Sequence, residues 1–312
     1  MDHHTFHAGE LAVQQRAGQR HIAEQRTGMV STTVMAGARP FIAGQFMVVL
    51  ASADSAGRMW SSMLFGQPGF AHAEGDAVLI EAPAAARDAA DPLWANLVVG
   101  GQLGMLFIDL GKRRRYRVNG VVRHLNGRHV EVDVREAYPN CPQYIQRRQL
   151  RQRSQPSASV LPQQAARGTT LSGAVAEIVR QADTVFVASH HADSGADASH
   201  RGGNRGFVQL LDDSTLRIPD YHGNSLFNTL GNFAVDPHAG LIIPDFAQGR
   251  LLQLTGTVTL QWHELAPGHL DGDTGRSLDF KVEQWLLRDM PLALEWEYLD
   301  ASPFNPGIVQ KV

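Results

Sequence analysis

The chain has 312 residues, of which 43% are hydrophobic and 19% are charged, and its formal net charge is −3. This length is typical of two domains, and the hydrophobic content is enough for buried cores, which excludes a disordered chain. The near balance of 28 basic and 31 acidic residues gives no reason to expect nucleic acid or an anionic membrane surface as a partner.

The cysteine content and the N-terminal sequence predict a cytoplasmic protein. Cys141 is the only cysteine, so no internal disulfide can form, and the first residues lack the basic and apolar regions of a signal peptide. No apolar run approaches the roughly 20 residues that cross a bilayer. We therefore expect a reducing compartment and no membrane segment.

Residues 1–40 are mixed in composition, and the helix formers between Gly9 and Ala17 predict one helix in this N-terminal arm. Residues 41–146 differ, because short apolar runs alternate with turn residues. The runs at 46–51, 78–80, 105–108, 116–118 and 121–122 predict strands, and the alternation over 128–134 is typical of a half-exposed strand. We expect a first strand-rich domain here.

Residues 147–170 are polar, with five arginines among Ser, Pro and Gln, and we expect a solvated connection between domains rather than a phosphate or RNA patch. Residues 172–181 predict a helix. Apolar runs then resume at 185–188, 207–211, 216–218, 241–243 and 251–258. Residues 171–312 are therefore expected to form a second strand-rich domain.

An internal repeat relates the two strand-rich segments. The set Gly104, Asp109 and Gly120 has spacings of five and eleven residues, and the same spacings recur in Gly240, Asp245 and Gly256. The sequences around them also agree, since 104–109, 117–122 and 66–70 resemble 240–245, 253–258 and 203–207. We infer two homologous, mainly β domains with a few helices. A barrel or sandwich is favoured, because closing a sheet removes its exposed edges.

The two copies differ where an anion could bind. Residues 197–203 read DASHRGG, and the first copy places Ser62 opposite Ser199 but Leu64 opposite Arg201. Arginine offers phosphate a bidentate fork, and serine and glycine-flanked N–H groups add donors. We expect one phosphate site at Ser199–Gly203, the alternative being a surface turn with a salt bridge.

A second donor-rich segment spans residues 219–233 and leads towards a predicted helix. Its amides and hydroxyls, Asn224 and Asn228 among them, could complete a phosphate or ribityl site at a helix start. The counterpart at 89–96 has few such donors. The alternative is a turn with an Asx cap.

These residues resemble the pyridoxamine 5'-phosphate oxidase-like, FMN-binding split-barrel family, and within it the large bacterial two-barrel members. The resemblance lies in residues 199–208 (SHRGGNRGFV), 223–232 and 240–246 (GLIIPDF), with 6–10 and 138–145 as further matches. It implies two tandem split β-barrels that form a pseudo-dimer within one chain. The flavin would lie between them, with its phosphate on the second barrel.

The resemblance also implies site residues and a cofactor. FMN is expected, with FAD as an alternative. The second barrel would hold it through Ser199, His200, Arg201, Gly202, Asn224, Asn228, Arg250 and Gln253, the last two against the isoalloxazine ring. The first barrel would add Trp60, Ser61, Ser62 and Arg114.

The activity is less closely defined than the cofactor. Residues 283–312 lack the Arg-x-His motif with which true pyridoxamine 5'-phosphate oxidases hold their substrate, so vitamin B6 oxidation is not expected. We expect a flavin-dependent oxidoreductase with a small-molecule substrate and a nicotinamide or reduced deazaflavin donor. The alternatives that stay open are a flavin carrier or sensor, a haem-binding split barrel and a barrel without cofactor. A homodimer of such chains also stays open.

No catalytic acid or base can be assigned from the sequence. His190, His191 and His200 are candidates because histidine titrates near neutrality, the alternative being surface turns. His3, His4 and His7 are expected to form a frayed end rather than a metal site. Cys141 is either a redox thiol or a packed, inert side chain.

Overall fold

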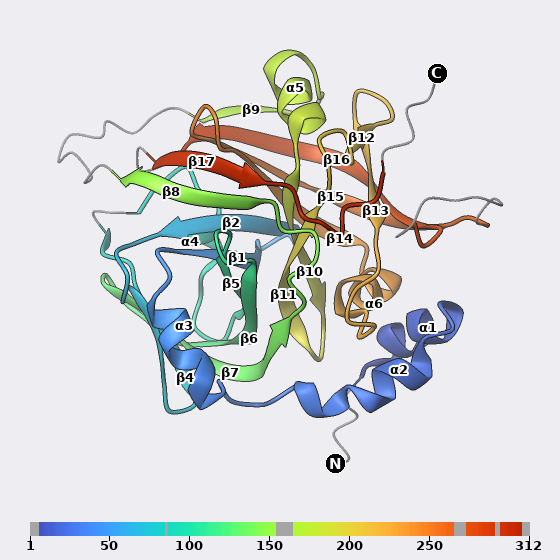
Figure 1. Cartoon of the computed structure of the whole chain (residues 1–312). Coiled ribbons are helices and arrows are strands. Elements are labelled where there is room, and N and C mark those ends of the chain that lie inside the picture. The colour runs from blue at the N-terminus through green and yellow to red at the C-terminus, as the bar shows by residue number, and fades with distance from the viewer. Residues whose placement is uncertain (1–5, 85–86, 154–164, 265–272, 291–293, 308–312) are drawn as a thin grey trace.

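The computed structural model describes residues 6–84, 87–153, 165–264, 273–290 and 294–307. In this part of the chain, two large antiparallel sheets carry most of the regular structure, and short helices accompany them. The protein is therefore mainly β, as predicted. Figure 1 shows the first sheet in blue to green and the second in yellow to red.

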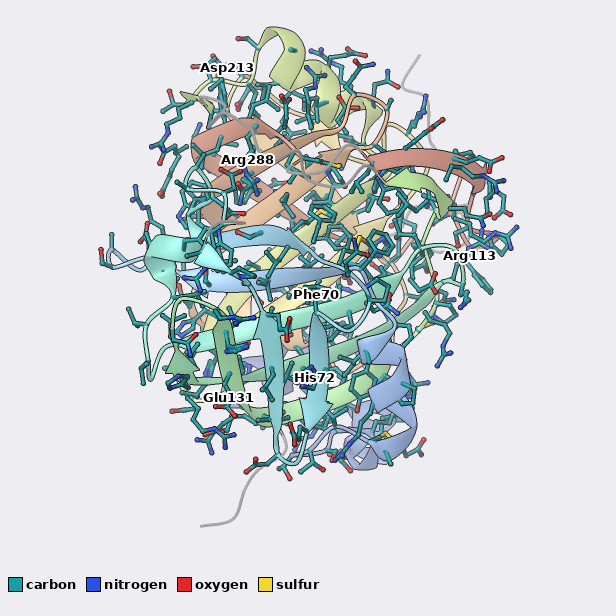
Figure 2. The ribbon with its side chains drawn as sticks, turned by 90° about the vertical axis from the view of Figure 1, so that its left-hand side faces the viewer. Phe70, His72, Arg113, Glu131, Asp213 and Arg288 are labelled. Carbon is teal, nitrogen blue, oxygen red and sulfur yellow. The ribbon has the colours of Figure 1, made fainter. Side chains whose placement is uncertain are left out.

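The first sheet has the strand order β2-β1-β5-β6-β7-β4-β3. Figure 2 looks onto its outer strands, where His72 and Glu131 are labelled. Its apolar side chains, among them Leu50, Met105 and Val118, are fully buried against each other. The strands are β1 (Met47–Ala53), β2 (Met59–Phe65), β3 (Ala71–Glu74), β4 (Ala77–Glu81), β5 (Gln102–Asp109), β6 (Arg114–Leu125) and β7 (His129–Asn140), and the helices are α3 (Arg39–Ala43) and α4 (Leu93–Asn96).

The second sheet has the order β11-β10-β14-β15-β16-β13-β12, with β9 (Ala166–Gly168) pairing with β16 outside this path. Its core includes Val187, Leu241 and Leu254. The strands are β10 (Thr184–His191), β11 (Gly195–Gly202), β12 (Gln209–Leu210), β13 (Thr215–Asp220), β14 (His238–Asp245), β15 (Arg250–Trp262) and β16 (Arg276–Asp289), and the helices are α5 (Gly173–Gln181) and α6 (Asn228–Val235).

The two sheets agree in register as well as in order. Leu50 of β1 is paired with Ser62 on one side and Met105 on the other, and Val187 of β10 is paired in the same way with Ser199 and Leu241. Continuing across the sheets, the pairs Met105–Val118 and Leu241–Leu254 match, as do Arg115–Asn140 and Leu251–Arg288. Equivalent positions are therefore Ser62 and Ser199, Leu64 and Arg201, Leu251 and Arg115, Gln253 and Arg117, and Arg288 and Asn140.

Within the described ranges neither sheet closes on itself, because β2 and β3 are the outer strands of one sheet and β11 and β12 those of the other. This corrects the expectation of closed sheets. One edge strand of each sheet is covered by the other half instead: β2 packs on β14 and β15, and β11 packs on β5 and β6. A Cβ on Gly104 would lie 2.8 Å from Cα of Asp197, and one on Gly240 would lie 2.7 Å from Cα of Trp60. The repeated glycines thus allow the two halves to approach closely.

The N-terminal arm crosses to the second half. Helix α1 (Ala8–Arg16) forms where predicted and packs beside α6, followed by α2 (Arg20–Gln25) and the short helices η1 (Thr27–Met29) and η2 (Ala36–Ala38) (Figure 1). His7 is the N-cap of α1 and forms a capping box with Glu10, so His7 is not part of a frayed end. His3 and His4 lie outside the described residues.

The segment expected to be a solvated connection begins as a strand. β8 (Arg147–Arg153) pairs with β17 (Leu294–Asp300), and residues 154–164 lie outside the described ranges. Arg148 of β8 is buried, pairs with Asp183, and places its guanidinium 4.3 Å from the ring centroid of Phe246. The ribbon of β8 and β17 therefore holds the start of this segment against the second half. None of the helices in the described ranges is long and apolar enough to span a membrane.

Candidate functional site

A polar pocket lies where β11 of the second sheet meets β6 of the first. The second half contributes β11, the segment after β13 and the first turn of α6, and the first half contributes β6 and the end of β7. The pocket spans about 600 Å³ of empty space, a volume that includes open solvent. Its lining includes Arg115, Arg117, Asn140, Cys141, Ser199, His200, Arg201, Asp220, Asn224, Phe227, Asn228 and Leu230.

Two of the three arginines in the pocket are held by carboxylates. Arg201 donates through Nη1 to Oδ1 of Asp220 at 2.6 Å, and Asp220 also accepts from Nε of Arg276 at 2.9 Å. Nη1 of Arg117 lies 3.0 Å from Oδ1 of Asp197, and Arg117 is buried. The Nε atoms of Arg117 and Arg201 have no partner within the described ranges. Both guanidinium groups are thus fixed in place and keep donor capacity for a ligand.

Arg115 differs, because none of the described carboxylates pairs with it. It donates through Nε to the carbonyl of Cys141 at 2.8 Å and through Nη1 to the carbonyl of His200 at 3.3 Å. Burial of the guanidinium, together with the positive charges of Arg117 and Arg201, lowers the pKa of Arg115 to about 9. The group still carries its charge at neutral pH. The pocket therefore has excess positive charge that an anion would offset.

The first turn of α6 lines the same pocket. It consists of Asn228, Thr229 and Leu230, and the N–H groups at a helix start have no intrahelical acceptor. The helix macrodipole adds partial positive charge at this end. Phe227, just before the helix, has a left-handed φ of 62°, which turns the chain into α6. The N-terminus of α6 and the arginines therefore both favour a negatively charged ligand.

His200 is a buried side chain without a partner. It is 5% exposed, and neither ring nitrogen has a hydrogen-bond partner among the described residues. Burial, followed by the charges of Arg115, Arg201 and Arg148, places the pKa of His200 well below its usual value. The imidazole is therefore neutral at physiological pH, with one nitrogen able to donate and one able to accept.

Neutral polar groups complete the pocket wall. The side-chain oxygen of Asn140 is buried and has no partner in the part of the chain that is described. The hydroxyl of Ser199 makes a single long contact, 3.5 Å to the carbonyl of Val187. The Cys141 thiol donates to Oε1 of Gln143 at 3.2 Å. Together these groups leave several hydrogen-bonding positions for a bound molecule.

A second cavity of about 380 Å³ adjoins the first and shares Arg115, Cys141, His200 and Arg201 with it. Tyr144 and Tyr221 form an aromatic pair in its wall, with ring centroids 5.0 Å apart. Gly202 also lines this cavity, and a side chain there would overlap the carbonyl oxygen of Tyr144.

The structure brings together the part of the predicted site that comes from β11 and the 219–233 segment. Ser199, His200, Arg201, Asn224 and Asn228 all line the first pocket, and Gly202 lines the adjoining cavity. The segment predicted to bind phosphate, Ser199–Gly203, is strand β11 up to Gly202. Arg201 is one of the pocket residues, as the phosphate hypothesis requires.

Three other predicted residues lie in a separate, buried cluster. Nε2 of Gln253 donates to the carbonyl of Ser61 at 2.9 Å and to Oγ of Ser62 at 3.1 Å. The same cluster contains Asp91 and Arg288. Gln253, Ser61 and Ser62 do not line the arginine pocket. Gln253 and Ser62 instead occupy the positions equivalent to Arg117 and Ser199.

The last three predicted residues lie outside both the arginine pocket and this buried cluster. Trp60 is buried and donates through its indole N–H to Asp54 at 3.3 Å. Arg250 pairs with Asp245 at 2.7 Å, and Arg114 is exposed, with its guanidinium 5.0 Å from the ring centroid of Phe41. None of the three lines the arginine pocket or the adjoining cavity, so their placement at the flavin stays a prediction.

Arg115, Arg117 and Asn140 were not predicted from the sequence. A signal for the arginines was present, because the repeat aligns Arg115 and Arg117 with Leu251 and Gln253. The same comparison of copies that singled out Arg201 would have singled out both.

The candidate histidines near the arm lie away from the arginine pocket and contact neighbouring side chains. The ring of His191 stacks on that of His7 at a centroid distance of 3.7 Å, and His190 contacts Gln102 and Asp236 through its two nitrogens. Neither lines the pockets. The described residues contain no group of three or more His, Cys, Asp or Glu that could hold a metal ion.

No family model and no curated protein matches the sequence. Solved structures are similar to part of the chain: HupZ of Group A Streptococcus (14% identity, TM-score 0.31, 38% of this chain and 99% of that one), a candidate pyridoxamine 5'-phosphate oxidase of Lactobacillus delbrueckii (11%, 0.32, 39% and 98%) and General Stress Protein 26 of Bacillus anthracis (7%, 0.27, 40% and 95%). Each match covers about two fifths of this chain. A ligand for the pocket therefore has to be inferred from the residues that line it.

Proposed function

We propose that the chain is a flavin-binding protein that holds one FMN in the pocket between its two sheets. One observation carries the proposal: Arg115, Arg117 and Arg201, from both halves, meet in one pocket in which Asp220 is the one carboxylate among the described lining residues. Phosphate is the biological anion that arginine forks and helix starts recognise best. The FMN phosphate is a dianion near neutral pH, which matches this excess charge.

The remaining lining fits the rest of the coenzyme. The side chains of Asn140, His200 and Ser199 supply donors and acceptors for ribityl hydroxyls and ring edges. Phe227 and Leu230 add apolar surface for an aromatic ring. Bound flavin would supply electron or hydride transfer, while the protein supplies binding, orientation and electrostatics.

We also propose that the two sheets are tandem split barrels, at 41–146 and 171–312, arranged as a pseudo-dimer. Their equal strand order and equal pairing register support this, as does the mutual packing of β2 and β11 on the opposite half. A pocket built from both halves then corresponds to a site at a subunit interface.

The first experiment is an absorption spectrum of the purified protein, with mass spectrometry of whatever heat releases. Flavin bands near 450 nm that bleach with a nicotinamide donor under anaerobic conditions support a flavin-dependent oxidoreductase. Flavin bands that no donor bleaches support a carrier or sensor. A Soret band contradicts the proposal and favours haem, for which the partnerless His200 is the candidate ligand.

The second experiment separates phosphate recognition from ring binding. Arg115→Ala should weaken FMN about 10- to 100-fold, the equivalent of one charge-assisted hydrogen bond of about 1.5–3 kcal/mol, and should change the Kd of riboflavin much less. Arg114→Ala is the matched control, because this neighbour lies outside the described cavities. Equal FMN affinities for the two variants, measured by fluorescence titration, would remove Arg115 from the phosphate site.

A further inference from the structure

The position equivalent to the arginine pocket, on the other side of the interface between the halves, is occupied by the chain itself. There the carboxylate of Asp91 accepts from Oγ of Ser62 at 2.6 Å and from Nε2 of Gln253 at 3.3 Å. Its other oxygen accepts from Nη2 of Arg288. Asp91, Ser62, Gln253 and Arg288 are all 5% exposed or less, so water does not reach this arrangement.

The donors around Asp91 stand at the register positions that line the open pocket. Ser62 is equivalent to Ser199, and Gln253 is equivalent to Arg117. Arg288 is equivalent to Asn140. The three positions that line the arginine pocket thus surround the carboxylate of Asp91 on the other side of the interface.

The charge around Asp91 also differs from the charge in the arginine pocket. Arg115 and Arg201 of the open pocket are replaced by Leu251 and Leu64. Among the described residues, Arg288 is then the one cation around Asp91. It donates to Asp91 and, at 2.7 Å, to Asp88. Figure 2 shows Arg288 on a strand of the second sheet, above the first sheet. The carboxylate of Asp91 therefore suffices as the anion beside Arg288, whereas the arginine pocket needs more negative charge.

We propose that this place is a second oxyanion site, which the side-chain carboxylate of Asp91 fills in place of a ligand. In the open pocket the corresponding anion then lies against Ser199, Arg117 and Asn140. Combined with the proposed flavin function, on which this consequence rests, the chain binds one FMN and not two.

The test removes the built-in anion and supplies a free one. Asp91→Ala leaves Arg288 buried without its nearest partner, and we expect Tm to fall by about 10 °C. Sodium formate, which replaces the lost carboxylate, should restore at least half of this loss in a saturable manner, with sodium chloride at equal ionic strength as reference. Inorganic phosphate is tested in parallel to determine whether the larger anion also enters.

Asp88→Ala is the matched control, because its side chain pairs with the same Arg288 but is 31% exposed. Formate that enters the arginine pocket should act alike on all three proteins, so the response of Asp91→Ala to formate over chloride should exceed that of Asp88→Ala and of the unaltered protein. If Asp91→Ala is insoluble, its refolding yield from urea with formate against chloride gives the same comparison. An Asp91→Ala protein that behaves alike in both salts overturns the second site.

The flavin content gives an independent check. One FMN per chain in the holoprotein agrees with a second oxyanion site that Asp91 fills, and two FMN per chain contradict it. Formate rescue in a protein that binds no flavin would leave the second site intact and overturn the proposed function alone.

Discussion

Replacing Glu10 by Gln should make the free energy of unfolding less dependent on pH. Glu10 of α1 is 3% exposed; its carboxylate accepts from the backbone N–H of His7 at 2.9 Å and from Nδ2 of Asn228 at 2.6 Å. Burial raises the pKa of Glu10 to about 8, the hydrogen bonds from His7 and Asn228 oppose this, and the nearby carboxylates Glu136 and Asp197 add to it.

The magnitude follows from proton linkage. The folded chain keeps the proton up to about pH 8, whereas the unfolded chain loses it near the ordinary Glu10 value of 4.5. Ionisation therefore favours the unfolded state as pH rises between these two values, and stability is lost over this window. At about 1.36 kcal/mol per pKa unit, the Glu10 contribution falls by about 2.5 kcal/mol between pH 5 and pH 7.

Urea unfolding of both proteins at pH 5, 6 and 7 measures this effect. The Glu10→Gln protein keeps a neutral side chain of the same shape, so its stability relative to the unaltered protein should rise by about 2.5 kcal/mol over the series. Other titrating groups cancel in the difference between the two proteins. A difference that stays constant with pH would refute the raised pKa of Glu10.

Two further pairs of substitutions test the packing. Gly9→Ala puts a methyl group onto a carbonyl oxygen of α6 and should lower the free energy of unfolding, measured with urea, by about 1–3 kcal/mol. Gly28→Ala is the control and should lower it by less than about 0.5 kcal/mol, because no atom lies within 4 Å of the new methyl group. Equal losses would mean that α1 is not packed on α6. Arg148→Ala leaves Asp183 buried without its partner and should cost about 3–5 kcal/mol, whereas Arg151→Ala breaks an exposed ion pair and should cost at most about 1 kcal/mol; similar losses for both would show that Arg148 does not anchor β8.

Much of the fold was predictable, because buried strands carry apolar runs that a sequence shows directly. The runs at 46–51, 105–108, 185–188 and 241–243 lie in β1, β5, β10 and β14. Strands β2 and β11 were not predicted, since their buried residues include polar ones such as Ser61, Asp197 and His200. These strands pack on the opposite half, and that environment is set by tertiary contacts rather than by local pattern. The run at 207–211 gave only the two-residue strand β12.

The site was predictable only in its second-half portion. Ser199, Arg201 and Asn228 are close in sequence to the signals that marked them. Arg115 and Asn140 join them only because two distant strands pair and then meet the other half. Gln253 lies with Ser61 and Ser62 rather than in the arginine pocket, because the repeat reveals equivalent residues but not which half each one faces. Its placement against a flavin ring stays a prediction.

The matched registers have a consequence for how this protein can vary. In an assembly of two identical chains, each substitution occurs at both interfaces, so a gain for binding at one is tied to its cost at the other. Here the two interfaces are encoded separately, with arginines at one and leucines at the equivalent positions of the other. One interface can therefore specialise in cohesion while the other changes its ligand.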